Sequence, residues 1–351
     1  MDRRTAHLLD DVAGKVAGVM HSLIRSHPDT VEELPKLQGL SQETLFPAPK
    51  GIAEVRFRKR WTLGGLVCED IAFESEHRPL LDSFARRHAE EYRANHHVHA
   101  RMLRHVGGRR RPTLLYLHGW MQPPAFFDEV SLLPMMARRL DANVIYMALP
   151  YHGKRKIPGF FWYGEYFLTS DLVRTLEAVR QSVLDARCLF EWLLHEGHGP
   201  VGAGGLSLGG SLALVLGCVE PRLAFLIPIV ANLDLAGALM EAPIFHRIRR
   251  DLRDRGWSAN KIQEFLEGVG WNDLKPKVPK ERMLFIAAEH DKYVTPESMR
   301  AFWEAWGRPA IHWFPGGHTG FIPYAWDWVG AMRRFLSGLD MRAATNGSGA
   351  A

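Results

Sequence analysis

The feature that most constrains the fold of this chain is a glycine-rich serine turn, Gly205-Leu206-Ser207-Leu208-Gly209-Gly210. The apolar run 201–206 before it is typical of a buried strand, and the apolar run 211–219 after it is typical of a buried helix. A strand that turns so abruptly into a helix leaves space only for small residues two positions before and after the serine. The pattern therefore predicts a turn that lifts the Ser207 hydroxyl out of a sheet and aims the Leu208 N–H at whatever the serine attacks.

From residue 112 onward, short apolar runs alternate with longer amphipathic runs. This alternation predicts the α/β class, with a mostly parallel central sheet and helices on both faces. The predicted strands are residues 113–117, 143–149, 201–206, 223–230, 283–288 and 310–314, and the predicted helices lie near 124–140, 170–196, 208–219, 296–306 and 323–337. Before this region, residues 52–58 and 66–73 have the composition and patterning of two further strands.

The segments outside this alternation predict additions to the sheet. Residues 1–50 are expected to form an N-terminal helical extension, and 51–342 the main domain, with a small helical cap inserted at about 232–276 and a disordered tail at 343–351. The N-terminal helix is indicated by apolar residues at helical spacing: Leu8, Leu9, Val12, Val16, Val19, Met20 and Leu23. We expect this helix to pack on the main domain or on a second subunit, because its polar face carries Asp10 and Asp11 and is not basic.

A charged segment at residues 78–105 predicts one helix that is rich in histidine. The histidines are His88, His96, His97, His99 and His105. Their spacing lacks the carboxylate–histidine signature of a metal site, and the neighbouring arginines repel a cation. No metal site is therefore expected in this segment.

A serine hydroxyl is a weak nucleophile, so Ser207 needs a base within hydrogen-bonding distance and an acid that orients the base. On a sheet of this kind the three residues follow in the chain order Ser, Asp or Glu, His. Asp291 lies just after a predicted strand, in Asp291-Lys292-Tyr293-Val294-Thr295-Pro296, and is the expected acid. Glu289 and Asp234 are the alternatives for this role, and capping of the following helix is the alternative role for Asp291.

The expected base is His318, which follows the last predicted strand in the glycine-rich loop Pro315-Gly316-Gly317-His318-Thr319-Gly320. Such a loop has room to bring a histidine over the serine. His290 and His312 lie nearby in the sequence, but neither occupies the loop after the final strand. A structural histidine with no catalytic role is the alternative.

Backbone N–H groups are expected to complete the site as an oxyanion hole. The predicted strand 113–117 ends at His118-Gly119, and the N–H that follows, of Trp120 or of Met121, is expected to join the Leu208 N–H. One such donor typically lowers the barrier by about 3 kcal/mol. We expect His118 to brace this loop rather than to titrate in catalysis.

The ordered set His118-Gly119, Gly205-x-Ser207-x-Gly209, Asp291 and His318 resembles the serine α/β-hydrolase superfamily, in which the serine turn is called the nucleophile elbow. The resemblance covers residues 112–338. A narrower similarity, to the abhydrolase-domain-18-type branch, lies in Leu149-Pro150-Tyr151-His152-Gly153-Lys154-Arg155-Lys156 and in the passage from Leu193 through Gly199-Pro200 to Gly210. The superfamily implies the α/β-hydrolase fold and a cofactor-free hydrolase of esters, thioesters, amides or lactones, and the branch fixes no substrate.

The constellation predicts a serine esterase that cleaves a carboxylic ester through an acyl-enzyme on Ser207. His118, Met121, Tyr151 and Phe321 are expected to contact the substrate. Aromatic residues in loops near the site favour an apolar, lipase-like acyl group unless they belong to the core: Trp120, Phe126, Phe127, Phe160, Phe161, Trp162, Tyr163, Phe321 and Tyr324. Arg155 and Lys156 extend the hypothesis to an amphiphilic or anionic ester such as a lipid. An acyltransferase or peptidase with the same triad, and a non-catalytic binding protein, are the alternatives.

Composition limits the partners and the cellular compartment that can be expected for this protein. The 351 residues are 46% hydrophobic, and the net charge of +5, from 44 basic and 39 acidic residues, does not by itself indicate a nucleic-acid partner. Three cysteines, Cys68, Cys188 and Cys218, are expected to be buried thiols in a reducing compartment. No signal peptide and no apolar run of about 20 residues is evident, which predicts a cytoplasmic protein without a transmembrane segment. Peripheral membrane contact and a homo-oligomer both stay open.

Overall fold

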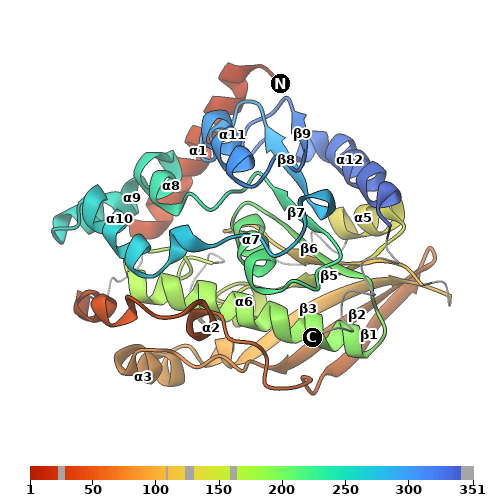
Figure 1. Ribbon diagram of the computed structural model, residues 1–351, viewed down its shortest axis with the longest axis horizontal. Coiled ribbons are helices and arrows are strands. Elements are labelled where there is room, and N and C mark those ends of the chain that lie inside the picture. Colours follow the sequence, from red (N-terminus) through yellow and green to blue (C-terminus); the bar gives the residue numbers. More distant parts are fainter. Residues whose placement is uncertain (23–27, 108–109, 123–129, 159–163, 341–351) are drawn as a thin grey trace.

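A computed structural model describes residues 1–22, 28–107, 110–122, 130–158 and 164–340, and these residues are built around one nine-stranded sheet (Figure 1). The strands are β1 Arg56–Leu63, β2 Leu66–Glu74, β3 His97–His105, β4 Thr113–Leu117, β5 Asn143–Met147, β6 Val201–Leu206, β7 Leu226–Ile229, β8 Leu284–Ala288 and β9 Ala310–Phe314. Their order is β1-β2-β3-β5-β4-β6-β7-β8-β9. From β5 to β9 all neighbours are parallel, whereas β1, β2 and β3 form an antiparallel extension. The mostly parallel sheet is confirmed.

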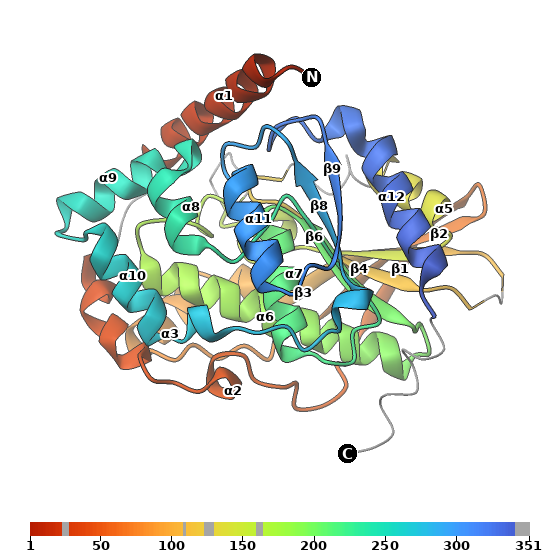
Figure 2. The same cartoon turned by 45° about the horizontal axis from the view of Figure 1, so that its top comes forward.

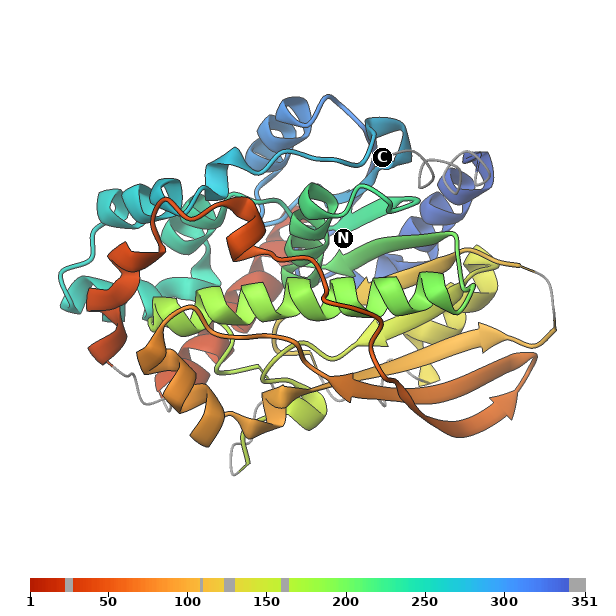
Figure 3. The same ribbon diagram turned by 60° about the horizontal axis from the view of Figure 1, so that its bottom comes forward.

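Helices cover both faces of the sheet, and each face has its own hydrophobic core (Figures 1 and 3). One face is covered by α5 Leu132–Leu140 and α12 Ala325–Gly338, and the other by α6 Leu172–His195, α7 Leu208–Val219 and α11 Pro296–Ala305. In β4, Leu114 and Tyr116 belong to the first core, and Leu115 and Leu117 to the second. A strand buried on both faces must be apolar throughout, which is why these strands were evident as continuous apolar runs.

The prediction of one helix over residues 78–105 is wrong. This segment forms α3 Asp82–Glu90, the 3₁₀ turn η2 Arg93–His96 and the strand β3. Along β3, the buried residues Val98, Ala100 and Met102 alternate with more exposed polar residues, which is the periodicity of a strand. The histidines are thus divided among several elements. In the described parts of the chain, no group of three or more His, Cys, Asp or Glu side chains is arranged to hold a metal ion.

Short helices follow β7 and form the segment that was predicted as a cap. They are α8 Leu235–Glu241, η4 Pro243–Phe245, α9 His246–Asp254, α10 Ala259–Gly268 and η5 Trp271–Asp273. Figure 2 shows α8, α9 and α10 grouped beside α6 and next to the N-terminal helix. The remaining short elements are η1 Pro28–Leu37, α2 Gln42–Leu45, η3 Gly153–Arg155, η6 Lys280–Arg282 and η7 Ile322–Tyr324.

The N-terminal helix, α1 Arg3–Ser22, buries a different face from the one expected. It packs on η4 and α9, and Figure 2 shows it running from α9 toward the end of β9. Its inner face carries small residues together with one carboxylate and Met20: Ala6, Asp10, Gly14, Ala17, Gly18 and Met20. The apolar residues expected to pack inward are exposed instead: Leu8, Leu9, Val12, Val16 and Val19. Leu23 lies outside the described residues.

Close approach explains this orientation of α1. A Cβ atom on Gly14 would lie 3.2 Å from the backbone of Pro243, and one on Gly18 would lie 2.1 Å from the ring of His246. Only a face of very small residues lets the helix sit at this distance from the cap segment. No helix in the described parts of the chain combines the length and the apolar character needed to span a membrane. The domain boundaries stay predictions, and the tail at 343–351 lies outside the described residues.

Candidate active site

The serine turn forms at the junction of β6 and α7, where Ser207 has φ 53° and ψ −118°. This left-handed φ is unusual for a residue other than glycine, and such strain is typical of functional positions. A Cβ atom on Gly205 would lie 2.4 Å from the Leu117 carbonyl oxygen, and one on Gly209 would lie 2.1 Å from the same atom. Any larger residue at either position would therefore collide with the backbone of β4, which is why the turn requires glycine on both sides.

Three side chains from distant parts of the chain meet at this turn. The Ser207 hydroxyl lies 2.7 Å from His318 Nε2, and His318 Nδ1 lies 2.8 Å from Asp291 Oδ2. The other oxygen of Asp291, Oδ1, accepts the backbone N–H groups of Tyr293 (2.7 Å) and Val294 (2.9 Å). Because these bonds fix the carboxylate, His318 Nδ1 is held as a donor and Nε2 is free to accept from the serine. This is the hydrogen-bonding order of a nucleophile, a base and an orienting acid.

Among the described residues, the hydrogen bonds of the His318 ring go to Ser207 and Asp291, and none of the alternative acids and bases takes part in them. Asp234 caps α8 by accepting the Gly237 N–H, and the carboxylate of Glu289 belongs to an exposed residue. His312 pairs with Asp327 at 2.8 Å. The helix α11 is capped by Thr295, so Asp291 is not its cap.

The electrostatic surroundings of His318 set the expected pH dependence of activity. Burial alone would lower the pKa of His318, but the adjacent Asp291 carboxylate outweighs burial and raises this pKa above its ordinary value of 6.5. A general base, the role predicted for His318, must be unprotonated, so kcat/KM is expected to fall with decreasing pH, with a midpoint above 6.5. The pH profile of kcat/KM for an activated ester measures this midpoint. A midpoint at or below 6.5 would contradict the assignment.

His118 holds the loop after β4 in place through two hydrogen bonds of its ring. Its Nε2 accepts the Leu149 N–H at 3.0 Å, so the proton resides on Nδ1, which donates to the Gly119 carbonyl at 2.8 Å. Burial lowers the pKa of His118 to about 4, so the ring is neutral at physiological pH. These bonds tie the end of β4 to the end of β5. His118 is fully buried and does not line the cavity over the serine, so it is not brought into contact with a substrate.

The residues whose backbone N–H groups are predicted to bind an oxyanion line the same cavity as Ser207. Leu208 is the first residue of α7, and N–H groups in the first turn of a helix have no acceptor within the helix. Trp120 and Met121 follow the end of β4 and line the same cavity as Ser207. The Trp120 indole Nε1 donates to the Gly164 carbonyl at 2.7 Å, which holds this loop in place.

A cavity of about 1210 Å³ lies over Ser207 and His318. It is lined mainly by apolar residues, to which α7, the cap segment and α1 contribute Leu212, Phe245 and Val16. Phe321, predicted to contact substrate, also lines it. Sequence reasoning missed the contribution of α1. Of the aromatic residues singled out from the sequence, Trp120 and Phe321 line the cavity, and Tyr324 packs against Phe314 with the two rings tilted. The others lie outside the described residues: Phe126, Phe127, Phe160, Phe161, Trp162 and Tyr163.

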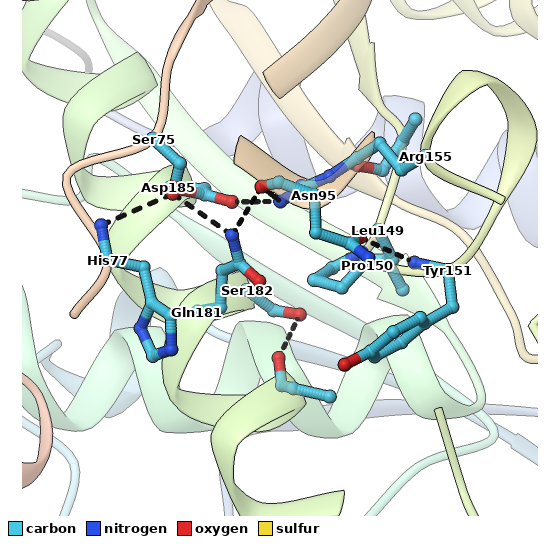
Figure 4. A network of polar contacts seen from close by, with 12 residues as sticks. Ser75, His77, Asn95, Leu149, Pro150, Tyr151, Arg155, Gln181, Ser182 and Asp185 are labelled. Atoms are coloured by element: carbon cyan, nitrogen blue, oxygen red, sulfur yellow. Dashed lines mark hydrogen bonds and ion pairs between the residues drawn. The ribbon is translucent and has the colours of Figure 1, made fainter. Parts of the chain in front are cut away.

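Tyr151 and Arg155 belong to a buried polar network, away from the cavity (Figure 4). Arg155 is fully buried and pairs with Asp185 of α6 at 2.8 Å, and Asp185 also accepts the Ser75 hydroxyl at 2.5 Å. The Tyr151 N–H donates to Asn95 Oδ1 at 2.9 Å. The structure therefore does not bring Tyr151 to the substrate cavity, and Arg155 is not available to bind an anionic substrate, because its charge is already neutralised inside the protein.

Removing one partner of this buried ion pair is expected to destabilise the fold. Arg155→Ala should lower the free energy of unfolding by about 3–5 kcal/mol, because Asp185 would be left charged and unpaired in the interior. The matched control is Arg308→Ala, whose ion pair with Glu304 is exposed and should contribute less than about 1 kcal/mol. Urea unfolding of both variants measures the difference. Equal urea midpoints for the two variants would show that the buried ion pair contributes no more to stability than the exposed one.

Comparisons with known proteins agree with this architecture. Residues 44–269 match the family model described as alpha/beta hydrolase domain containing 18. The uncharacterized protein Rv2627c of Mycobacterium tuberculosis is 31% identical over 239 residues, which are 66% of this chain and 55% of that protein. The uncharacterized protein YdjC of Bacillus subtilis is 32% identical over 75 residues, 21% of this chain and 65% of that protein. The chain thus spans only about half the length of the mycobacterial relative.

Solved structures share the fold at low identity. The acetyl xylan esterase from Paenibacillus sp. R4 has a TM-score of 0.58 and 13% identity, covering 88% of this chain and 99% of that one. Acetyl xylan esterase 1 from Thermoanaerobacterium sp. JW/SL YS485 has a TM-score of 0.59 and 17% identity, covering 90% and 95%. These likenesses confirm the α/β-hydrolase fold. The family match contains the serine turn but ends before Asp291 and His318, and because it covers more than half of the sequence, the chain belongs to the alpha/beta hydrolase domain containing 18 family.

Proposed function

We propose that this protein is a serine hydrolase that cleaves carboxylic esters, with Ser207 as nucleophile, His318 as base and Asp291 as the acid that orients it. The observation that carries the proposal is the continuous chain of hydrogen bonds from the Ser207 hydroxyl through the His318 ring to the Asp291 carboxylate. Both solved structures compared above are acetyl xylan esterases, which supports the choice of an ester.

The reaction follows from the positions of these groups. His318 Nε2 takes the proton of Ser207 as the hydroxyl oxygen attacks the acyl carbonyl, and the N–H groups of Leu208 and Trp120 stabilise the oxyanion. His318 then gives its proton to the departing alcohol, which leaves an acyl-serine. Water, deprotonated by the same ring, attacks this ester, and collapse of the second tetrahedral intermediate releases the carboxylic acid and restores the serine.

The size and lining of the cavity favour an ester with a sizeable apolar acyl group. A volume of about 1210 Å³ exceeds the roughly 300–1,000 Å³ typical of small-molecule sites, and the lining is mainly apolar. Two arginines of α5, Arg138 and Arg139, also line the cavity, but apolar residues far outnumber them. The apolar walls favour longer acyl chains, because each methylene group that the cavity buries contributes about 0.8 kcal/mol to the binding free energy.

Exposed apolar residues at the rim of this cavity support the proposal that the ester reaches the site from an anionic lipid surface. Three rim residues, Val16, Ile322 and Trp326, line the cavity and are exposed by 40%, 69% and 63%. On α1 the apolar face continues outward from Val16, while Asp10 is turned into the protein. Lys15 is exposed on α1. Arg3 and Arg4 are also exposed on this helix, and Asp11 is paired with Lys292, so the exposed apolar face is edged by unopposed cations. This is the arrangement by which amphipathic helices bind anionic lipid surfaces.

A chain-length series of p-nitrophenyl esters, with and without anionic phospholipid vesicles, tests the function and the substrate class. We expect hydrolysis to rise in kcat/KM from acetyl to medium and long acyl chains, and vesicles to retain the protein in sedimentation. Activity on short esters only would exclude the apolar-acyl assignment, and absence of retention would exclude the lipid surface. Mass spectrometry of the products should show the free acid, whereas an acylated acceptor alcohol would indicate acyl transfer.

A further inference from the structure

Asp10, on the inner face of α1, is a buried carboxylate whose two oxygens bind both loops of the proposed triad. Its exposure is 0%, although it lies in a surface helix. Oδ2 accepts the N–H groups of Lys292 (3.1 Å) and His318 (3.2 Å). Oδ1 accepts the N–H and the hydroxyl of Thr319, at 2.9 and 2.8 Å. One side chain thus makes four hydrogen bonds to residues 282 to 309 positions away in the chain.

The residues that Asp10 binds are the immediate neighbours of the proposed acid and base. Lys292 follows Asp291, and the second bond is to the backbone of His318 itself. A bond between His290 N and Gly316 O joins the two loops nearer to the strands from which they emerge. Asp10 adds a second tie at the catalytic ends of the loops. Hydrogen bonds to a charged acceptor are roughly twice as strong as those between neutral groups, so the four bonds of Asp10 restrain the two loops strongly.

Packing around Asp10 leaves little room for it to move. A Cβ atom on Gly317 would lie 3.1 Å from Asp10 Oδ2 and 3.2 Å from the Ala6 side chain. The Tyr293 hydroxyl donates to the Asp10 carbonyl at 2.5 Å, and the Tyr293 ring lies 4.7 Å from the His318 ring. The helix is therefore fitted closely against the base loop, and its backbone contacts the residue that packs on the imidazole.

We propose that Asp10 is a positioning residue, which holds the Asp291 loop and the His318 loop at the separation that lets the imidazole bridge serine and carboxylate. It touches neither the reacting atoms nor the substrate. This inference rests on the proposed function. The inference makes α1 a part of the active site. The family match begins at residue 44 and therefore does not include this helix.

The test compares Asp10→Asn with Asp11→Asn, a matched control one residue away that loses the same charge. Asp11 is partly exposed and pairs with the Lys292 ammonium group on the outside of the helix. Active sites are counted by stoichiometric labelling with a fluorophosphonate, and kcat is expressed per labelled site. We expect Asp10→Asn to lower kcat per site by about 10- to 100-fold, with little change in KM, because small misplacements of catalytic groups have effects of this size. Asp11→Asn should match the wild type.

A purely structural role would reduce the number of labelled sites but leave kcat per site unchanged, and that result would overturn the proposal. Where Asp10→Asn does not fold, Thr319→Val removes one of the four bonds and should lower kcat per site in the same direction, by a smaller factor. Hydrogen exchange gives a readout that needs no activity: the amides of Lys292, His318 and Thr319 should exchange faster in Asp10→Asn than in Asp11→Asn. Equal exchange in both variants would refute the proposal even if the wild type shows no esterase activity, a result that would separately refute the proposed function.

Discussion

Ser207→Ala is expected to lower kcat for an activated aryl ester by about 10⁶-fold, the scale seen when the serine of a serine protease triad is removed. The serine hydroxyl lies 2.7 Å from the only described imidazole that reaches it, and its removal leaves no atom to carry the acyl group. The same substitution should abolish labelling by a fluorophosphonate probe. Steady-state kinetics and labelling of the purified variant measure both effects.

The matched control for this prediction is Ser337→Ala, an exposed serine on α12, which should label and turn over like the wild type. If Ser207→Ala retained labelling, another residue would be the nucleophile and the proposed mechanism would be wrong. If neither the wild type nor the variant reacted, the chain would be an α/β-hydrolase-fold protein that binds its ligand without cleaving it.

Asp291→Asn is expected to lower kcat by about 10⁴-fold while leaving the fold intact. The amide oxygen can still accept the N–H groups of Tyr293 and Val294, so the loop keeps its shape. The amide nitrogen then faces His318 Nδ1 and forces the ring into the tautomer whose Nε2 carries a proton. A ring in that state cannot accept the serine proton. Circular dichroism and kcat on the same preparation separate the chemical effect from unfolding.

Glu289→Gln is the control, because this exposed carboxylate is one of the two alternatives that the sequence offers for the role of acid. Its activity should equal that of the wild type. A large loss in Glu289→Gln, with Asp291→Asn unaffected, would reverse the assignment of the acid.

Positions of the candidate site that depend on local turns and on the order of strands could be predicted from the sequence. Ser207, Asp291 and His318 each follow a short apolar run, and parallel strands bring their carboxyl ends to one edge of a sheet, so residues far apart in the sequence were expected to meet. The glycines around Ser207 were informative because the backbone of β4 excludes any side chain there. These features need no knowledge of distant side-chain contacts.

Features that depend on distant partners could not be predicted in this way. Arg155 was expected on an accessible loop because nothing near it in sequence signals the pairing with Asp185 on α6. The strand β3 was mistaken for helix because its polar residues obscure the alternation of Val98, Ala100 and Met102. For α1 the hydrophobic stripe was misleading. A better signal was the recurrence of Ala6, Asp10, Gly14 and Gly18 at intervals of four, which marks a face that permits close packing.

The attachment of Asp10 to His318 has a consequence for how the protein is made. The two residues are 308 positions apart, so at about 5–20 residues per second a ribosome needs roughly 15 to 60 s to synthesise the partner after the helix residue. Until Lys292 is made, near the end of that interval, the Asp10 carboxylate has none of its four donors, and α1 cannot pack on the loops of the proposed triad. Assembly of the proposed active site is therefore a late event, completed when an early helix packs on loops made near the end of translation.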